Sequence, residues 1–327
     1  MKPELHQIFF KFSPIYKEVT WGGTRIFEFK NIAEAGACVG ESWEISGVNG
    51  QESVVSEGED KGLLLSELVA KYKSQLVGNS NYNLYGDHFP LLIKFIDARN
   101  TLSVQVHPNE SIARQRHDCS GKSEMWYIID AEKDAQMYIG LREALSKEEY
   151  NVMVSEKTLL DVIERHTPQP GNSYYIPAGR VHSIGAGILL LEVQQASDIT
   201  YRIYDFDRKD KNGNMRELHT ELAMEAIDLN KTDNCACTPL FLTEQTEQLV
   251  KCPYFEVRKS DINGEIELHQ NDSFTIAVCV EGDIELNATL NGRTEKMELK
   301  CGFSTLIAAA ATNIKVTGIG KLITATT

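Results

Sequence analysis

Hydrophobic and polar residues alternate over many short stretches of the chain, which is the pattern of β-strands with one buried face. The segment Leu102–His107 reads LSVQVH, so a strand here sends its apolar residues to one side and Ser103, Gln105 and His107 to the other. Further downstream, Ile188–Val193 reads as a largely apolar strand. The polar side of Leu102–His107 therefore belongs in water or in a polar pocket.

Helical spacing of apolar residues is limited to short segments. In Leu63–Tyr72 this spacing predicts an amphipathic helix on the outside of the β structure. Further helices are expected at Pro108–Cys119, Ala144–Ser155, Thr158–Arg165 and Glu217–Leu229. From Pro239 onward the chain returns to short strand patterns separated by turns. The whole pattern predicts a mainly β protein with a few short helices.

Length, charge and cysteine usage narrow the possible functions. A chain of 327 residues suits about two domains. Its formal net charge of −14 argues against nucleic acid or a membrane surface as a partner, since both attract clustered Lys and Arg. No apolar run reaches the ~20 residues of a membrane-spanning helix. Seven cysteines without the spacing of a disulfide framework, and no signal-peptide pattern in Met1–Lys30, favour the cytoplasm.

A second motif follows downstream, in Gly171–His182. Here Gly171, Pro177, Gly179 and His182 have the order Gly-x5-Pro-x-Gly-x2-His. The Gly and Pro residues turn the chain at both ends of a short strand, so that His182 starts the next strand facing inward. This order resembles the second motif of the cupins, a family of small β-barrels. The resemblance implies that the polar side of Leu102–His107 lies inside a barrel.

Four side chains are candidate metal ligands. The first cupin motif presents a His pair and then a Glu, and this chain offers Gln105, His107 and, after an insertion, Glu124, which would join His182. Such a mixed nitrogen and oxygen set suits Zn²⁺ with open positions, but Fe²⁺, Mn²⁺ or Co²⁺ would also bind. For Gln105 there is an alternative role, as a hydrogen-bond partner that supports His107 without touching the metal.

Longer runs narrow the resemblance to one family. The runs are GESWEIS (Gly40–Ser46), PLLIKFIDARNTLSVQVHPNE (Pro90–Glu110), GKSEMWYII (Gly121–Ile129) and IPAGRVHSIGAGILLLEVQQASDITYRIYDFDR (Ile176–Arg208). They are similar to the type I phosphomannose isomerases in their short bacterial form. The resemblance implies two cupin (jelly-roll-like) β-barrels and one Zn²⁺ per chain. It also implies a metal-dependent isomerase that interconverts mannose 6-phosphate and fructose 6-phosphate through an enediolate.

The same resemblance suggests roles for charged residues near the ligands. Arg202 matches the catalytic arginine of the family, and Asp198 lies close enough in sequence to orient it. The base that moves the proton stays open between Lys122, Glu124 and a hydroxide on the metal, because arginine is almost always protonated.

The phosphate of the substrate would lie at the mouth of the pocket. Lys94, Ser103 and Lys122 match family positions associated with substrate binding, and they offer charge and hydrogen bonds. A solvent-exposed Lys94 at a strand end is the alternative. The chain has no Gly-rich phosphate loop, which fits a site built from strands.

Two domains are expected, with residues 1–230 as the catalytic metal-binding cupin domain with helical insertions and residues 231–327 as a smaller cupin-like domain without metal. The second region has one histidine, His269, and no copy of the Gly171–His182 motif. Competing functions are a cupin oxygenase with a three-His iron site, a sugar-binding cupin without activity, or a metal-binding cupin acting on another sugar phosphate. The oligomeric state stays open.

Overall fold

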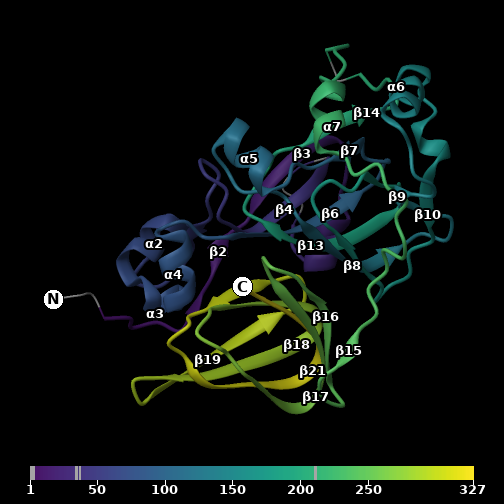
Figure 1. Ribbon diagram of the computed structural model, residues 1–327. Coiled ribbons are helices and arrows are strands. Elements are labelled where there is room, and N and C mark those ends of the chain that lie inside the picture. The colour runs from purple at the N-terminus through teal and green to yellow at the C-terminus, as the bar shows by residue number, and fades with distance from the viewer. Residues whose placement is uncertain (1–3, 34–35, 37, 210–211) are drawn as a thin grey trace.

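The computed structural model describes residues 4–33, 36, 38–209 and 212–327. Within these residues the strands form four sheets, and the paired strands in them are antiparallel (Figure 1). The mainly β fold class is therefore confirmed.

The sheets differ in size and in their place along the chain. The five-stranded sheet has the order β10 (Ile163–His166), β9 (Met137–Leu141), β12 (His182–Ile184), β7 (Val104–Val106) and β14 (Tyr201–Tyr204). The six-stranded sheet has the order β11 (Ser173–Ile176), β8 (Glu124–Ala131), β13 (Ile188–Gln195), β6 (Leu91–Ala98), β4 (Val39–Ser46) and β3 (Ile15–Gly23). A small sheet pairs β2 (Phe12–Ser13) with β5 (Val54–Val55).

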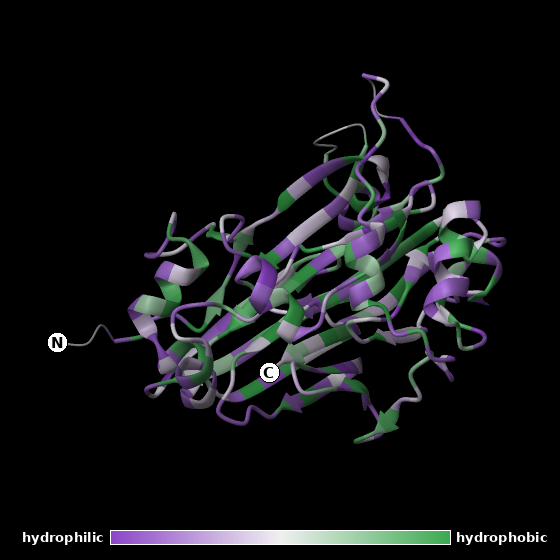
Figure 2. Cartoon of the chain, turned by 45° about the horizontal axis from the view of Figure 1, so that its top comes forward, coloured by the Kyte–Doolittle hydropathy of each residue, from purple (hydrophilic) through white to green (hydrophobic). Residues whose placement is uncertain are grey.

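The eight-stranded sheet is almost entirely C-terminal. Its order is β1 (Phe9–Phe10), β20 (Ser304–Ile307), β18 (Thr275–Leu290), β21 (Thr312–Thr326), β17 (Glu256–Leu268), β16 (Thr246–Lys251) and β15 (Leu240–Phe241), with β19 (Arg293–Lys300) paired to β18. These strands form a separate barrel-like body at one end of the molecule (Figure 1). Hydrophobic and hydrophilic residues alternate along its long strands, as Figure 2 shows. The N-terminal strand β1 forms one edge of this sheet, where Phe9 pairs with Ile307 of β20.

The six-stranded sheet is buried on both faces. Along β13, Leu189 and Leu191 belong to the hydrophobic core that this sheet shares with the eight-stranded sheet. Ile188 and Leu190, on the opposite face, belong to the core shared with the five-stranded sheet. Burial on both faces explains why the strand reads as a continuous apolar run. Glu192 continues the second face and so points into the barrel that the five- and six-stranded sheets enclose.

Seven short helices lie outside the sheets in the described part of the chain. They are α1 (Arg25–Lys30), α2 (Leu65–Tyr72), α3 (Ser74–Val77), α4 (Asn79–Tyr85), α5 (Glu110–His117), α6 (Lys147–Glu156) and α7 (Thr220–Ala226). The predicted helices that correspond to α2, α5, α6 and α7 are confirmed with shifted ends. In Figure 1, α2, α3 and α4 lie beside the C-terminal sheet, and α6 lies at the opposite end of the molecule.

The predicted helix at Thr158–Arg165 is wrong. Lys157 takes a left-handed conformation (φ 60°) that ends α6, and only one 3₁₀ turn, η1 (Leu159–Asp161), follows it. Strand β10 then pairs with β9, and its Ile163 is buried in the core between the five-stranded sheet and helices α6 and α7. His166 therefore lies at the end of a strand and not of a helix.

Among the described residues, no helix is both long and apolar enough to cross a membrane.

Candidate metal centre

Three neighbouring strands of the five-stranded sheet bring three predicted site residues into one row. Gln105 on β7 lies opposite His182 on β12 in the antiparallel register. On its other side, Gln105 lies opposite Arg202 on β14. Residues paired in this way point to the same face of a sheet. His107, two residues after Gln105, continues that face, so the alternation in Leu102–His107 correctly predicted a shared polar side.

The facing six-stranded sheet contributes the complementary charges. Glu124 begins β8, and Glu192 on β13 lies opposite Lys94 on β6 and Trp126 on β8. The side chains of Lys94, Glu124 and Glu192 all lie in the interior, with residue exposures of 5%, 1% and 2%. The sequence alternative of a solvent-exposed Lys94 is therefore wrong.

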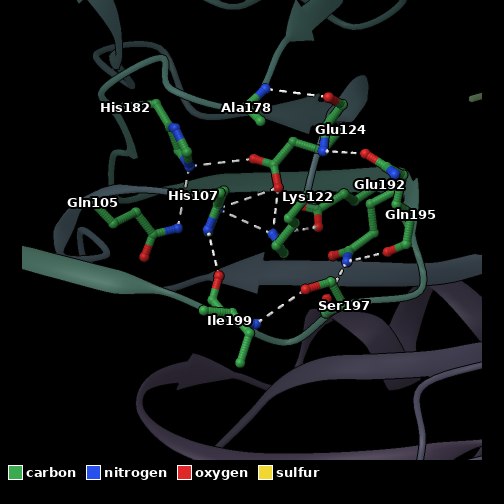
Figure 3. A network of polar contacts seen from close by, with 12 residues as sticks. Gln105, His107, Lys122, Glu124, Ala178, His182, Glu192, Gln195, Ser197 and Ile199 are labelled. Atoms are coloured by element: carbon green, nitrogen blue, oxygen red, sulfur yellow. Dashed lines mark hydrogen bonds and ion pairs between the residues drawn. The ribbon is translucent and has the colours of Figure 1, made fainter. Parts of the chain in front are cut away.

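The two histidines present their Nε2 atoms to one carboxylate (Figure 3). His107 Nδ1 lies 2.9 Å from the Ile199 carbonyl, and His182 Nδ1 lies 2.8 Å from the Arg180 carbonyl. A carbonyl only accepts hydrogen bonds, so each Nδ1 carries the proton and each Nε2 keeps its lone pair. These Nε2 atoms lie 3.4 and 3.3 Å from the two oxygens of Glu124.

Electrostatics keep these histidines neutral. Burial, aided by the charge of Lys122, holds the pKa of His107 well below its usual range. Burial likewise lowers the pKa of His182 to about 4, although its bond to the Arg180 carbonyl opposes the shift. Lone pairs on neutral imidazoles therefore face a carboxylate, and a cation between them is the arrangement that removes this repulsion.

Lys122 and Gln105 fill the space around these atoms. Lys122 Nζ donates to His107 Nε2 at 3.1 Å and also bonds Glu124 Oε2. The amide nitrogen of Gln105 lies 3.3 Å from His182 Nε2, and its oxygen accepts from Ser103 at 3.2 Å. Gln105 thus supports His182 and not His107, which corrects the alternative role considered for it. Ligation by the Gln105 oxygen requires its amide to turn over.

The arrangement fits a divalent metal ion. The ligand atoms of His107, Glu124 and His182 all lie within 4.8 Å of one another, and all three residues are buried. Glu124 Oε1 is buried without a hydrogen-bond partner, although it faces His182 Nε2. Two neutral imidazole nitrogens and a carboxylate with one unpaired oxygen form the kind of donor set that binds first-row metal ions.

Sequence reasoning missed two carboxylates that organise Lys94. Lys94 Nζ lies 3.2 Å from Glu41 and 3.2 Å from Glu192. Glu41 accepts from the Trp43 indole at 2.7 Å, and Glu192 accepts from Trp126 at 2.9 Å. Burial opposes the charge of Lys94, but Glu192 and Glu41 outweigh it and raise the pKa of Lys94. The sequence offered one signal for Glu192, because it is the only charged residue in the otherwise apolar run Ile188–Val193.

Arg202 reaches the site edge with hydrogen-bonding capacity left over. Its Nη1 donates to the Glu217 carbonyl at 2.9 Å, and its Nε is buried without a partner. Asp198 is exposed and accepts from Gln51 at 3.4 Å, so the structure does not bring it to Arg202. Its charge nevertheless contributes to the raised pKa of Lys94.

Fold and site together define a cupin-type β protein with a candidate metal centre in its N-terminal barrel. Residues 9–151 match the family model "Phosphomannose isomerase type I, catalytic domain", and residues 245–327 match "Mannose-6-phosphate isomerase, cupin domain". The mannose-6-phosphate isomerase ManA of Bacillus subtilis is 40% identical over 83% of this chain and 85% of its own length. The mannose-6-phosphate isomerase of Streptococcus mutans is 38% identical over 83% of this chain and 84% of its own length.

Solved structures agree with these matches. The crystal structure of the mannose 6-phosphate isomerase from Bacillus subtilis has a TM-score of 0.87 and 34% identity, covering 98% of this chain and 99% of that one. The chain therefore belongs to the type I phosphomannose isomerases. Its reaction is the interconversion of mannose 6-phosphate and fructose 6-phosphate, and the recognition made from the sequence runs is confirmed.

Proposed function

We propose that His107, Glu124 and His182 hold one Zn²⁺ per chain, with the Gln105 oxygen as a fourth ligand once its amide turns over. The observation that carries this proposal is that two unprotonated Nε2 atoms face the Glu124 carboxylate, whose Oε1 has no hydrogen-bond partner. A zinc ion held by these groups supplies positive charge where the enediolate oxygens form. Zinc is favoured over other divalent metals only by the family resemblance.

Arg202 is proposed as the second positive group beside the reacting oxygens. Its side chain lies on the same face as Gln105 and His182, and its Nε has a free hydrogen in the buried site. A guanidinium stays charged through the reaction and does not take up the substrate proton. It therefore binds and orients an oxygen of the open-chain sugar.

Lys122 is proposed as the group that moves the proton between the two carbons. Of the other two candidates, a hydroxide on the metal and Glu124, the carboxylate is proposed as part of the ligand set because of its position between His107 and His182. Lys122 Nζ lies in the same buried space, at 3.1 Å from His107 Nε2 and 3.7 Å from Glu192. An amine at this place, in its unprotonated form, takes the proton from one carbon and returns it to the next.

Phosphate binding is assigned to Lys94 and Ser103, with Asp198 at the substrate side of the pocket. Lys94 is held as a cation between two carboxylates, and Ser103 is buried with its hydroxyl directed at Gln105. Hydrogen bonds from a cation and a hydroxyl suit a phosphate oxygen.

The division of labour between the two halves is also proposed. Residues 1–230 would form the catalytic unit, and residues 231–327 a barrel that binds no metal and supports the first. Among the residues that the structure describes, the buried polar residues of the second region are all serines and threonines, which supports this assignment. All seven cysteines are free thiols, which supports a reducing, cytoplasmic location.

The metal proposal is tested by following fructose 6-phosphate formation from mannose 6-phosphate. Purified protein is assayed as isolated, after chelation, and after zinc is restored, and metal content is measured in each sample. We expect chelation to abolish turnover and zinc to restore it at one ion per chain. Full activity in protein shown to be free of metal would contradict the proposal.

A further inference from the structure

A cluster of one aspartate and two arginines lies just beyond β14. Asp205 is 5% exposed, and its carboxylate accepts from Arg216 Nε at 2.8 Å and from Arg208 Nη2 at 2.5 Å. Arg216 Nη2 bonds the same carboxylate, so that its guanidinium makes a two-pronged contact. Burial opposes the charge of Asp205, but the two arginines outweigh it and lower the pKa of Asp205.

The cluster leads directly to Arg202. Glu217 follows Arg216 in the chain, and its carbonyl accepts from Arg202 Nη1 at 2.9 Å. His219 pairs with the backbone of Arg202 in both directions, since its Nδ1 accepts from the Arg202 N–H and its own N–H donates to the Arg202 carbonyl at 2.7 Å. Fixing Arg216 on Asp205 therefore fixes the segment that carries the partner of the Arg202 guanidinium.

The same aspartate is tied to the strand of the ligands. Arg208 Nη1 donates to the Thr101 carbonyl, two residues before Ser103 and four before Gln105. Arg208 also returns to Asp205 through its Nε, which donates to the Asp205 carbonyl at 3.2 Å. Asp205 thus joins the Glu217 segment to the chain that enters β7.

The backbone at this point is held in an unfavourable conformation. Phe206 and Asp207 follow Asp205 with φ angles of 56° and 51°, in the left-handed region. Non-glycine residues are unfavourable in this region, and surrounding contacts must hold two of them in succession. The guanidinium of Arg208 lies 5.4 Å from the Phe206 ring and belongs to those contacts.

We propose that Asp205 is a positioning residue for the isomerase reaction, which holds Arg202 in its working geometry through Arg216 and the Glu217 carbonyl. This inference rests on the role proposed above for Arg202. Neutralising Asp205 leaves the guanidinium groups of Arg202, Arg208 and Arg216 close together without their shared counter-charge. The Glu217 segment then moves away from Arg202, and a displacement of about 1 Å at a catalytic group lowers kcat roughly a hundredfold.

The test is a double-mutant cycle measured on zinc-loaded protein. Asp205→Asn is expected to lower kcat by about ten- to a hundredfold, with a smaller change in KM and one zinc per chain retained. In the Arg202→Lys background, whose shorter side chain does not reach the Glu217 carbonyl in the same way, Asp205→Asn is expected to change kcat less than about twofold. Asp207→Asn is the matched control, because Asp207 is exposed, shares the turn and, among the described residues, pairs with Lys157 at 2.7 Å.

Each result has a defined meaning. Wild-type kcat in Asp205→Asn overturns the role of Asp205. An equal loss of kcat in the wild-type and Arg202→Lys backgrounds also overturns it, because it would indicate a structural role alone. An equal loss in Asp207→Asn overturns it too. Wild-type kcat in Arg202→Lys removes the role of Arg202, and this inference falls with it. If Asp205→Asn does not fold, Arg216→Gln breaks the same bond from the more exposed side and replaces it in the cycle.

Discussion

The two barrels of this chain have interiors of opposite character. Between the five- and six-stranded sheets, six ionisable side chains are buried: Lys94, His107, Lys122, Glu124, His182 and Glu192. In the C-terminal sheet, the buried polar residues of the described chain are Ser260, Ser273, Thr275, Thr305 and Thr324. The rest of that core is apolar.

This difference separates folding from function. The C-terminal sheet is stabilised by apolar burial, which needs no charges inside. The N-terminal barrel keeps two lysines, two glutamates and two histidines away from water, and each has to be offset by a partner. Charges that are costly for folding therefore gather at the candidate site, whereas the buried polar residues described in the C-terminal region are all uncharged.

Among the substitutions in the N-terminal barrel, Glu124→Gln should lower activity most. The amide keeps the shape of the side chain but removes the charge that faces both histidines, so that zinc binding weakens and kcat/KM falls at least about a thousandfold. Zinc content and turnover are measured together. The matched control is Glu281→Gln on β18, since Glu281 is exposed and pairs with Lys321 at the surface. A variant of Glu124 with full zinc and more than a tenth of wild-type kcat would contradict the ligand role.

Lys122→Met should have the next largest effect. It removes the amine proposed to move the proton and leaves the three ligand residues in place, so kcat falls about a hundredfold or more while zinc remains bound. Lys321→Met, at the exposed pair of the other barrel, should leave kcat unchanged. If Lys122→Met instead kept kcat and only raised KM, Lys122 would be a substrate-binding residue and another group would move the proton.

Most residues of the candidate metal centre could be predicted from the sequence, because the signals for them are local. Gln105 and His107 share one face of a strand through simple alternation, and the motif that ends in His182 combines turns with a following strand. Glu124 came from the cupin order of ligands. The antiparallel register of Gln105 with His182 follows from the fold, and the ligand atoms of His107, Glu124 and His182 lie within 4.8 Å of one another.

The residues that sequence missed act across long distances in the chain. Glu192 was hidden in an apolar run because that strand is buried on both faces. Helix α4 was not predicted because its N-terminal cap comes from the C-terminal region, where Asp272 accepts from the N–H groups of Asn79 and Ser80 at 2.9 and 3.1 Å. Local propensity contains no information on such partners.

The buried ion pair of Lys30 and Glu44 sharpens the comparison, because it lies outside the metal centre. Lys30 Nζ contacts both Glu44 oxygens at 2.7 and 2.9 Å, beside the rings of Phe95 and Phe303. Lys30→Met alone leaves a buried unpaired carboxylate and should lower the free energy of unfolding by roughly 3–5 kcal/mol. The double variant Lys30→Met/Glu44→Gln should recover most of this loss.

Urea denaturation of the single and double variants measures these differences, and kcat should stay at the wild-type value in the double variant. That result would show that burying charge is a requirement of the active site and not of the barrel fold. A double variant less stable than Lys30→Met would contradict the prediction. It would mean that the pair contributes net stability where the six-stranded sheet meets the C-terminal barrel.

The smallest expected effect is the pH dependence of the same pair. Burial raises the pKa of Glu44 above its usual value, although Lys30 and Ser42 oppose the shift. A carboxyl group that holds its proton more tightly in the folded state favours folding while it is protonated, and this contribution is lost as pH rises through the raised pKa. The free energy of unfolding of wild type minus that of Glu44→Gln should therefore fall as pH increases from about 4.5. For Glu149→Gln on α6 the corresponding difference should rise with pH below about 4.5, because bonds from Ser146 lower the pKa of Glu149 and its contribution is lost as pH falls through that lowered pKa. Equal slopes for the two variants would show that Glu44 is not destabilised by burial and that its pair with Lys30 is favourable in itself.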